Sequence, residues 1–317
     1  MQFTLVGAGA LGTILGAHLI AAGHDVRLIA RGRRALQLAD EGLKVRGLTE
    51  LALPCEAVTK PDPTRDRGVL IFAVKTYHMD AALEATGELV PHAVFSLANG
   101  VMKNEQLARA FGRDRVLGCM ANFSGELEDD GAVLFTRNVM LYLGGPNAAA
   151  KELASVIDAA GINTEASPHI ETVEWSKFVG WLALFALAVI ARSTTGRCLD
   201  NLHFAHLGVA VIREAAAIAE ARGITLIDQS PVPVRSLAMG PFREAVERLR
   251  QVGREMHETA PKHRMSALQD LEAGRELEVH ETLGYAVREA ARLGVDAPTL
   301  ALCYEIGAGL NTLRTAG

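Results

Sequence analysis

The sequence predicts an α/β domain followed by a second, all-helical domain. In the first half, short apolar segments alternate with helical stretches, and in the second half strand-like segments disappear. At the start of the chain, the apolar segment Gln2–Val6 runs directly into Gly7-x-Gly9-x-x-Gly12. A strand, a glycine-rich turn and a helix, in that order, form the context in which this spacing binds a dinucleotide. We therefore expect the first domain to be of the Rossmann type, a dinucleotide-binding fold.

The first half fits repeated strand–helix units, which give a parallel sheet covered by helices on both faces. The predicted strands are Gln2–Val6, Asp25–Ala30, Val69–Val74, Ala93–Leu97 and Val116–Met120. The predicted helices between them include Ala10–Ala22, Asp80–Glu88 and Lys103–Phe111. Two further strand-like runs, Gly131–Thr136 and Met140–Gly144, flank Arg137-Asn138 and predict a hairpin added to this sheet. A helix over Asn147–Ala160 and a strand over Ile162–Ala166 complete the domain.

The character of the sequence changes at Ser167-Pro168, which places the predicted domains at residues 1–167 and 168–317. Beyond this point Ala, Leu, Glu and Arg recur with helical periodicity. The predicted helices are Ile170–Ala191, Phe204–Arg222, Pro241–Glu258, Glu276–Leu293 and Pro298–Asn311. We expect the substrate to bind in a cleft between the two domains.

Each glycine of the first loop has a physical role in this interpretation. Gly7 permits the tight turn, Gly9 lets the backbone approach a pyrophosphate, and Gly12 lets the helix pack closely on the strand. The free N–H groups at the helix start attract phosphate. The predicted cofactor-binding loop therefore consists of Gly7, Ala8, Gly9, Ala10, Leu11 and Gly12.

The end of the second strand favours NADP over NAD. An NAD-binding fold usually places an acidic residue there to bind the ribose 2′-hydroxyl group. In this chain the strand ends in a basic segment that contains Arg31 and Arg34, and Asp25 lies at its opposite end. A guanidinium group suits the 2′-phosphate of NADPH, so Arg31 is the predicted ligand and Arg34 a weaker helper. A solvated basic turn is the alternative.

Composition excludes several classes of function. The 317 residues are 49% hydrophobic and 22% charged, with a net charge of −5, so no basic surface for nucleic acid is predicted. Four scattered cysteines indicate reduced, mostly buried thiols in a cytoplasmic protein, with a catalytic cysteine left open. The apolar run 3–22 is predicted to be a phosphate loop with its helix, and the apolar run 178–191 is predicted to be a buried helix. Neither a membrane segment nor a cleaved signal is therefore expected. His203 and His206 have no third ligand nearby, so no metal site is predicted.

Five segments, in this order along nearly the whole chain, resemble the ketopantoate reductase (2-dehydropantoate 2-reductase) family. Two of them follow predicted strands of the first domain, and the other three lie in the second domain. They are Phe72-Ala73-Val74-Lys75-Thr76, Leu97-Ala98-Asn99-Gly100-Val101, Glu174-Trp175-Ser176-Lys177-Phe178, Ser266-Ala267-Leu268-Gln269-Asp270-Leu271 and Gly274-Arg275-Glu276-Leu277-Glu278-Val279.

The resemblance implies a role for individual residues of this chain and a place in pantothenate biosynthesis. Lys75 and Asn99 would line the NADPH cofactor beside the nicotinamide. Lys177 would be the catalytic proton donor, and Ser266 would bind the substrate. Glu278 would contact both cofactor and substrate.

The residue types also suit the chemistry without the resemblance. Reduction of a ketone leaves an alkoxide that must be protonated, and the ammonium of Lys177 can donate that proton and stabilise the charge. Ordinary structural roles remain open for all four polar candidates. Lys75 and Lys177 would then be solvated lysines, Asn99-Gly100 a turn and Ser266 a helix cap.

The substrate end departs from the family pattern. The family has asparagines four and eight positions beyond the lysine, where this chain has Trp181 and Phe185. Spacing of four places both on the face of the helix that carries Lys177. The leading prediction is therefore reduction of 2-dehydropantoate, and the alternatives are reduction of a more apolar 2-oxo acid and a non-catalytic NADPH sensor. A homodimer is also left open.

Overall fold

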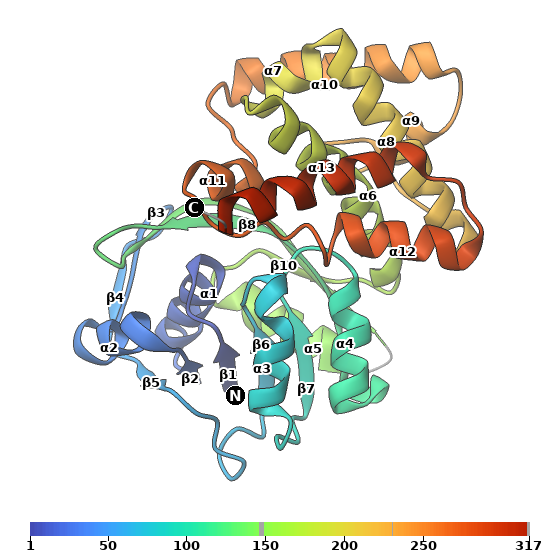
Figure 1. Ribbon diagram of the computed structural model, residues 1–317. Helices are drawn as coiled ribbons and strands as arrows, with labels where there is room; N and C mark the ends of the chain where they lie inside the picture. Colours follow the sequence, from blue (N-terminus) through green and yellow to red (C-terminus); the bar gives the residue numbers. More distant parts are fainter. Residues whose placement is uncertain (146–148, 230, 316–317) are drawn as a thin grey trace. The chain divides into compact units, whose positions relative to one another are not determined.

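A computed structural model describes residues 1–145, 149–229 and 231–315 of the chain (Figure 1). The chain forms two compact units, Met1–Ile170 and Glu171–Gly317. The first unit combines helices with a parallel sheet and the second is helical, which confirms the predicted fold class.

The first unit is built on a parallel sheet of five strands in the order β5-β2-β1-β6-β7. Its strands are β1 (Gln2–Val6), β2 (Asp25–Ile29), β5 (Glu56–Val58), β6 (Val69–Phe72) and β7 (Ala93–Ser96). Successive strands extend the sheet in one direction from β1 and then in the other from β6. The strand order therefore reverses between β1 and β6, and ligands bind at such a point, beyond the carboxyl ends of the strands.

Helix α1 (Ala10–Ala21) is apolar on all sides because it lies between two sheets. Its buried side chains Ile14, Leu15 and Leu19 belong to one core with Phe3 of the parallel sheet and Phe135 of the second sheet. A helix that is apolar all round is one that is buried all round. Much of the apolar run at the start of the chain is therefore core.

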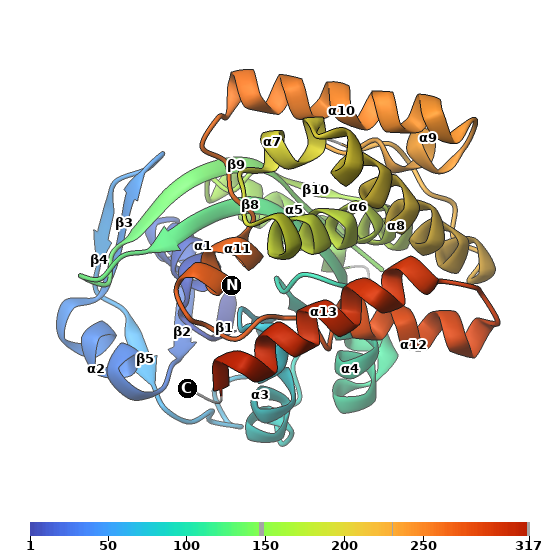
Figure 2. The same cartoon turned by 45° about the horizontal axis from the view of Figure 1, so that its top comes forward.

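The second sheet of this unit was only partly predicted. Its strands are β3 (Leu43–Gly47), β4 (Leu51–Leu53), β8 (Gly118–Leu127), β9 (Val133–Gly144) and β10 (Thr164–Ala166). The order is β10-β9-β3-β4, with β8 antiparallel to β9 (Figure 2). The predicted hairpin turning at Arg137-Asn138 is wrong, because β9 passes through these residues without turning. Register shifts against β8 on both sides of the Phe123–Ser124 step explain the irregular pattern there.

The remaining helices of the first unit are α2 (Gly32–Glu41), α3 (Met79–Thr86), α4 (Met102–Phe111) and α5 (Ala149–Ala159), with 3₁₀ turns at Thr76–His78 and Arg113–Arg115. Helices α3 and α4 cover the face of the parallel sheet opposite α1 (Figure 1). Met79 and Leu107 pack there against Val6, Phe72 and Val94. The parallel sheet is thus covered on both faces, as predicted. Residue 147, where the last predicted helix was expected to begin, lies outside the described residues.

The second unit contains α6 (Ile170–Ala191), α7 (Thr195–Asp200), α8 (Leu202–Ala221), α9 (Val234–Ala238), α10 (Phe242–Thr259), α11 (Ser266–Glu272), α12 (Leu283–Leu293) and α13 (Pro298–Thr315). The predicted bounds of the first helix are confirmed. The predicted helix over Glu276–Leu293 is wrong in its first part, because α12 begins only at Leu283. The preceding residues form an irregular connection from α11.

Two helices of this unit, α6 and α8, are long and apolar enough to cross a membrane by length and composition alone. In α6, 89% of the most apolar window is buried inside the protein. Its small residue Gly180 approaches Val232 and Val234, and its Leu187 approaches Gly208 of α8. These contacts are those of a core helix. In α8, 44% of the most apolar window is buried inside the protein.

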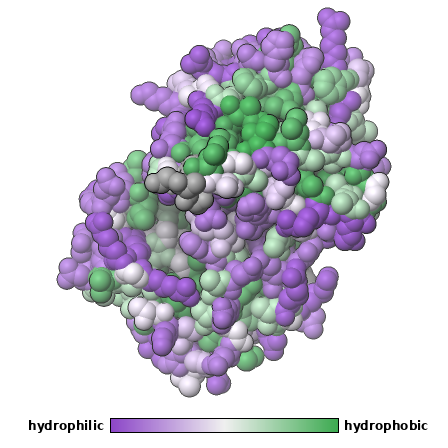
Figure 3. All heavy atoms as spheres, viewed as in Figure 1, coloured by the Kyte–Doolittle hydropathy of each residue, from purple (hydrophilic) through white to green (hydrophobic). Residues whose placement is uncertain are grey.

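Helix α13 begins at a carboxylate supplied by another helix. Glu214 of α8 accepts the backbone N–H groups of Thr299 at 3.0 Å and Leu300 at 2.7 Å. The negative charge satisfies orphan donors and complements the helix dipole. Figure 3 shows an apolar area on the helical unit in the region of α13. Leu302 and Ile306 of this helix are exposed.

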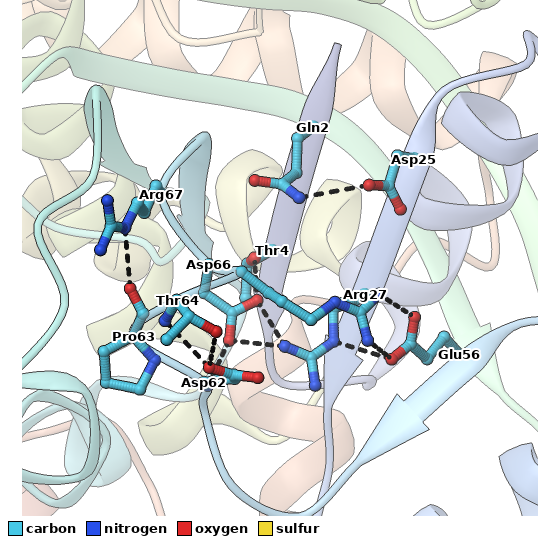
Figure 4. Close-up of polar contacts among 11 residues, drawn as sticks. Gln2, Thr4, Asp25, Arg27, Glu56, Asp62, Pro63, Thr64, Asp66 and Arg67 are labelled. Carbon is cyan, nitrogen blue, oxygen red and sulfur yellow. Dashed lines mark hydrogen bonds and ion pairs between the residues drawn. The ribbon is translucent and has the colours of Figure 1, made fainter.

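A buried ion pair joins the strands of the parallel sheet (Figure 4). Arg27 of β2 contacts both carboxylate oxygens of Asp66 at 2.9 Å, and the side chain of Asp66 is 0% exposed. Asp66 also accepts the hydroxyl group of Thr4 on β1 at 2.8 Å. Arg27 reaches Glu56 of β5 at 3.0 Å. Because Thr4, Arg27 and Glu56 are register neighbours on three adjacent strands, the cluster fixes their alignment.

The variant Asp66→Asn is expected to lower the free energy of unfolding by about 3–5 kcal/mol, because it leaves the buried Arg27 cation with only the half-exposed Glu56 as a counter-ion. The matched variant Glu56→Gln removes a half-exposed partner of the same arginine and should cost less than about 1 kcal/mol. Urea unfolding followed by circular dichroism measures both. Equal effects of the two variants would contradict the central role of Asp66.

Candidate active site

The glycine loop follows the carboxyl end of β1, at the point where the strand order reverses between β1 and β6. Gly7 follows β1 with φ +102°, and its N–H group donates to the carbonyl oxygen of Ile29 at 2.9 Å. A Cβ atom at Gly7 would lie 2.7 Å from Val74 Cγ1 and 2.8 Å from the carbonyl oxygen of Ala73. Both the backbone conformation and the close approach to the chain after β6 therefore require glycine.

Gly12 and Gly9 have opposite surroundings. A Cβ atom at Gly12 would lie 2.2 Å from the carbonyl oxygen of Gly7, so α1 packs directly on the loop. A Cβ atom at Gly9, the N-cap residue of α1, would meet no heavy atom within 4 Å. The first turn of α1 contains no acidic residue. An open space at the N-terminus of a helix whose first turn carries no carboxylate fits the pyrophosphate of a dinucleotide.

The chain segments after β6 and β7 carry the next two predicted residues. Lys75 is partly exposed and precedes the short 3₁₀ turn after β6. Asn99 is also partly exposed and precedes Gly100, whose φ is +82°. Both residues thus lie beyond the carboxyl ends of adjacent parallel strands, where ligands bind in such sheets.

A buried lysine that the sequence did not single out supports the loop after β7. The ammonium of Lys103, on α4, donates to the carbonyl oxygens of Ala98 at 2.8 Å and Cys119 at 2.6 Å. Lys103 is 5% exposed. It ties the backbone beside Asn99 to β8. No sequence signal marks it, because a lysine in the first turn of a helix ordinarily points to solvent.

The two arginines after β2 differ in their contacts. Arg31, the N-cap residue of α2, is exposed, and its guanidinium makes one long contact of 3.5 Å to the carbonyl oxygen of Ala81. Arg34 lies one turn into α2 and is partly buried. Its guanidinium donates to the carbonyl oxygens of Ala8 at 2.9 Å and Gly131 at 2.8 Å. Arg31 is therefore accessible to a ligand, whereas Arg34 is held inside the unit.

In the second unit, Lys177 lies two turns into α6 and not at the helix start, so the dipole of the first turn has little effect on it. Every residue from Val173 to Val189 is buried except Lys177. Trp175 and Phe178 lie on a different face of α6, since the ring of Trp175 stacks under the guanidinium of Arg222. Lys177 thus belongs to a face distinct from the one that packs on α8.

Trp181 and Phe185 follow Lys177 at spacings of four and lie on its side of the helix. Their ring centroids are 4.9 Å apart with an interplanar angle of 38°. Both are buried, Phe185 almost completely. The positions at which the family pattern has amides therefore hold two aromatic rings in contact.

The remaining predicted residues lie around α11 and the connection after it. Ser266 is the first residue of α11, and the N-cap position belongs to Met265, so Ser266 does not cap this helix. Glu278 is 5% exposed. Beside it, the side chain of Asn311 on α13 bonds to both backbone groups of Leu277, at 2.9 and 3.3 Å. These two hydrogen bonds hold the segment that carries Glu278. They join residues 34 positions apart, which the sequence does not reveal.

Three of the four cysteines have thiols whose pKa values are raised. Burial raises the pKa of Cys303 to about 11 and also raises the pKa values of Cys55 and Cys198. A thiol with a raised pKa is a poor nucleophile near neutral pH. Across the described residues, no group of three or more His, Cys, Asp or Glu side chains could hold a metal ion.

The glycine loop at the sheet's switch point and the helical second unit define a dinucleotide-binding oxidoreductase of two units. Residues 3–147 match the model of the family described as ketopantoate reductase PanE/ApbA, and residues 169–310 match the C-terminal model of the same family. The chain therefore belongs to the ketopantoate reductase family.

Relatives match over nearly the whole chain. The 2-dehydropantoate 2-reductase of Archaeoglobus fulgidus is 29% identical over 296 residues, which cover 92% of each chain. A crystal structure of a PanE/ApbA family ketopantoate reductase from Ralstonia eutropha has a TM-score of 0.83 at 25% identity, covering 99% of this chain and 100% of that one. The ternary structure of D-mandelate dehydrogenase with NADH and anilino(oxo)acetate has a TM-score of 0.85 at 20% identity, with coverage of 99% and 100%, and shows similarity of fold alone.

The variants Gly9→Ala and Gly12→Ala should separate binding from folding. At Gly9, φ is −73° and space is open, so alanine is expected to change the free energy of unfolding by less than about 1 kcal/mol. Its methyl group would occupy the space through which the phosphate approaches and weaken dinucleotide binding at least about tenfold.

Gly12→Ala should destabilise the protein by about 1–3 kcal/mol or more, because the added atom meets fixed backbone. Thermal unfolding and titration calorimetry test both, and a destabilised Gly9→Ala would contradict the assignment.

Proposed function

We propose that the protein is an NADPH-dependent reductase of a 2-oxo acid, with 2-dehydropantoate as the leading substrate and Lys177 as the proton donor. The observation that carries the proposal is the accessibility of Lys177 on an otherwise buried stretch of a core helix. A lysine retained at such a position is costly for folding alone, since burial penalises its charge. Relatives named 2-dehydropantoate 2-reductase support the substrate.

The cofactor preference is argued from the end of β2. Arg31 is the exposed residue that begins α2, and Asp25 lies at the other end of the strand. A free guanidinium at this point matches a 2′-phosphate group, whereas a carboxylate would have matched a 2′-hydroxyl group. This arrangement favours NADPH over NADH.

The chain's own residues account for the proton and the charge in the reaction. When bound, the reduced nicotinamide supplies a hydride to the keto carbon of the substrate. Lys177 then donates a proton from Nζ to the oxygen of that carbon, which would otherwise become an alkoxide. Its positive charge also favours the developing negative charge. We assign Glu278 to holding the ammonium or the nicotinamide ribose, and Ser266 to the substrate.

A second candidate, a more apolar 2-oxo acid, is favoured by Trp181 and Phe185. The two tilted rings offer fewer hydrogen-bonding groups to a substrate hydroxyl group than two amides would, and a site with fewer such partners discriminates less for that group. Aromatic faces instead favour an apolar substituent on the 2-oxo acid. D-mandelate dehydrogenase, bound to anilino(oxo)acetate in a solved structure, has the same fold and acts as a guide to the compounds that should be assayed.

Turnover of 2-dehydropantoate, a phenyl-bearing 2-oxo acid and a short aliphatic 2-oxo acid should be measured by oxidation of NADPH. Lys177→Ala is expected to lower kcat by about 10²–10⁴-fold, the usual contribution of a general acid. Lys177→Arg keeps the positive charge but does not release its proton near neutral pH, so it should also lose kcat while NADPH still binds. Turnover confined to phenyl-bearing or aliphatic acids would favour the second candidate. Binding of NADPH without turnover of any acid would refute both.

Trp181→Leu is expected to raise KM for the preferred substrate by about tenfold with kcat little changed, because an apolar contact made equally in ground and transition states is lost. Trp175→Leu is the matched control, since it deletes the same ring from another face of α6, where the ring stacks on Arg222. The control should lose stability but keep its KM. A similar rise in KM for both variants would show that the effect reports on folding.

A further inference from the structure

The guanidinium of Arg34 is the centre of a closed set of hydrogen bonds around the glycine loop. Its Nε donates to the carbonyl oxygen of Ala8 at 2.9 Å, and its Nη2 donates to Thr13 Oγ1 at 2.9 Å. The hydroxyl group of Thr13 in turn donates to the same carbonyl oxygen at 3.2 Å. The carbonyl oxygen of Ala8 therefore accepts two hydrogen bonds, which use both of its lone pairs.

The same guanidinium reaches the second sheet of the unit. Its Nη1 donates to the carbonyl oxygen of Gly131 at 2.8 Å and to Gln37 Oε1 at 3.0 Å. Gln37 donates to the carbonyl oxygen of Asp130 at 2.7 Å, so the turn between β8 and β9 is bound to α2 at two points. The glycine loop is thereby tied to a turn that follows it by more than a hundred residues.

These contacts leave little of Arg34 for a ligand. Its four hydrogen bonds leave a single N–H group of the guanidinium, on Nη2. Bidentate binding of a phosphate group needs two parallel N–H groups. All four partners are neutral, and burial lowers the pKa of Arg34 below its ordinary value. The expectation that Arg34 helps to bind the 2′-phosphate therefore does not fit these contacts.

The orientation of one peptide plane follows from this set of hydrogen bonds. A trans peptide is planar, and its C=O and N–H groups point in opposite directions. Because the carbonyl group of Ala8 is directed to Arg34 and Thr13, the N–H group of Gly9 is directed away from them. Gly9 is the residue whose Cβ position is open, and it begins α1. The exposed N–H group is thus presented where a phosphate group can accept it.

We propose that Arg34 is a positioning residue that holds the Ala8–Gly9 peptide in the orientation that binds the pyrophosphate, and that it does not recognise the 2′-phosphate. The inference rests on the proposed function only in that the loop binds a nicotinamide dinucleotide. The pyrophosphate is common to NADPH and NADH, so loss of Arg34 affects both. The 2′-phosphate is specific to NADPH, so loss of Arg31 affects one.

Dissociation constants for NADPH and NADH should be measured by calorimetry for Arg34→Met and Arg31→Met. For Arg34→Met we expect both constants to rise by a similar factor of about 10–100, the equivalent of a lost hydrogen bond to a charged group. For Arg31→Met we expect a rise of that size for NADPH and a change within about twofold for NADH. A loss confined to NADPH in Arg34→Met, or no loss in either constant, would overturn the proposal.

A second measurement needs no dinucleotide. Hydrogen–deuterium exchange of the peptide that spans residues 6–13 should be faster in Arg34→Met than in the wild type, at temperatures where both are folded. Thr13→Val removes one side of the closed set and should have the same effect to a smaller degree, whereas Thr13→Ser keeps the hydroxyl group and should restore wild-type exchange. Unchanged exchange in Arg34→Met would reject the positioning role. If the wild type bound neither dinucleotide, the proposed function would fail, and exchange would still test the role of Arg34.

Discussion

The close approach of α1 to the glycine loop is the constraint on which the rest of the first unit depends. A Cβ atom at Gly12 would lie 2.2 Å from the carbonyl oxygen of Gly7, so the helix and the end of β1 can meet only if that residue is glycine. This contact sets the depth at which α1 enters the space between the two sheets. Because α1 is buried on both sides, its side chains are mostly apolar and a buried polar one such as Thr13 is hydrogen-bonded. Its N-terminal N–H groups must be satisfied by something outside the helix. A bound phosphate is such a partner.

Four strands of the parallel sheet, β1, β2, β6 and β7, were predicted from the sequence because their residues are mostly buried and apolar. The short, partly exposed β5 was missed, and the predicted fifth strand, Val116–Met120, is wrong because most of it belongs to β8 of the second sheet. The second sheet was only partly predicted, because β3 and β4 are short and partly exposed and show no clear alternation. In β9, bulges interrupt the alternation near Arg137, and a sequence pattern cannot distinguish a bulge from a turn. The residues before α12 contain good helix formers, but the backbone of Leu277 is held by Asn311, and this tertiary contact overrides the local preference.

The candidate site was predictable where a residue acts from a fixed place in the fold. Gly7, Lys75 and Asn99 follow parallel strands, and the structure places all three beyond the carboxyl ends of those strands. Residues that act through another residue were not predictable. Arg34 bonds to a carbonyl group 97 positions away, and the sequence offers only a second arginine in a basic turn. Lys103 likewise resembles any lysine in the first turn of a helix until its ammonium is found between two backbone carbonyl groups.

The proposed cofactor-binding and substrate-binding parts of the site differ in whether backbone or side chains form them. The proposed cofactor end is formed mainly by backbone: N–H groups, glycine conformations and carbonyl groups held by side chains. Few residue types satisfy these backbone requirements, so its sequence pattern can be recognised in a single chain. The proposed substrate end is formed by side chains on α6, where Trp181 and Phe185 can replace amides without altering a helical backbone. A helix tolerates such exchanges as long as its core packing is retained, and both rings are buried. On the proposed function, substrate preference can therefore change while the fold and the proposed proton donor are kept, so the sequence favours a reaction type more strongly than a particular acid.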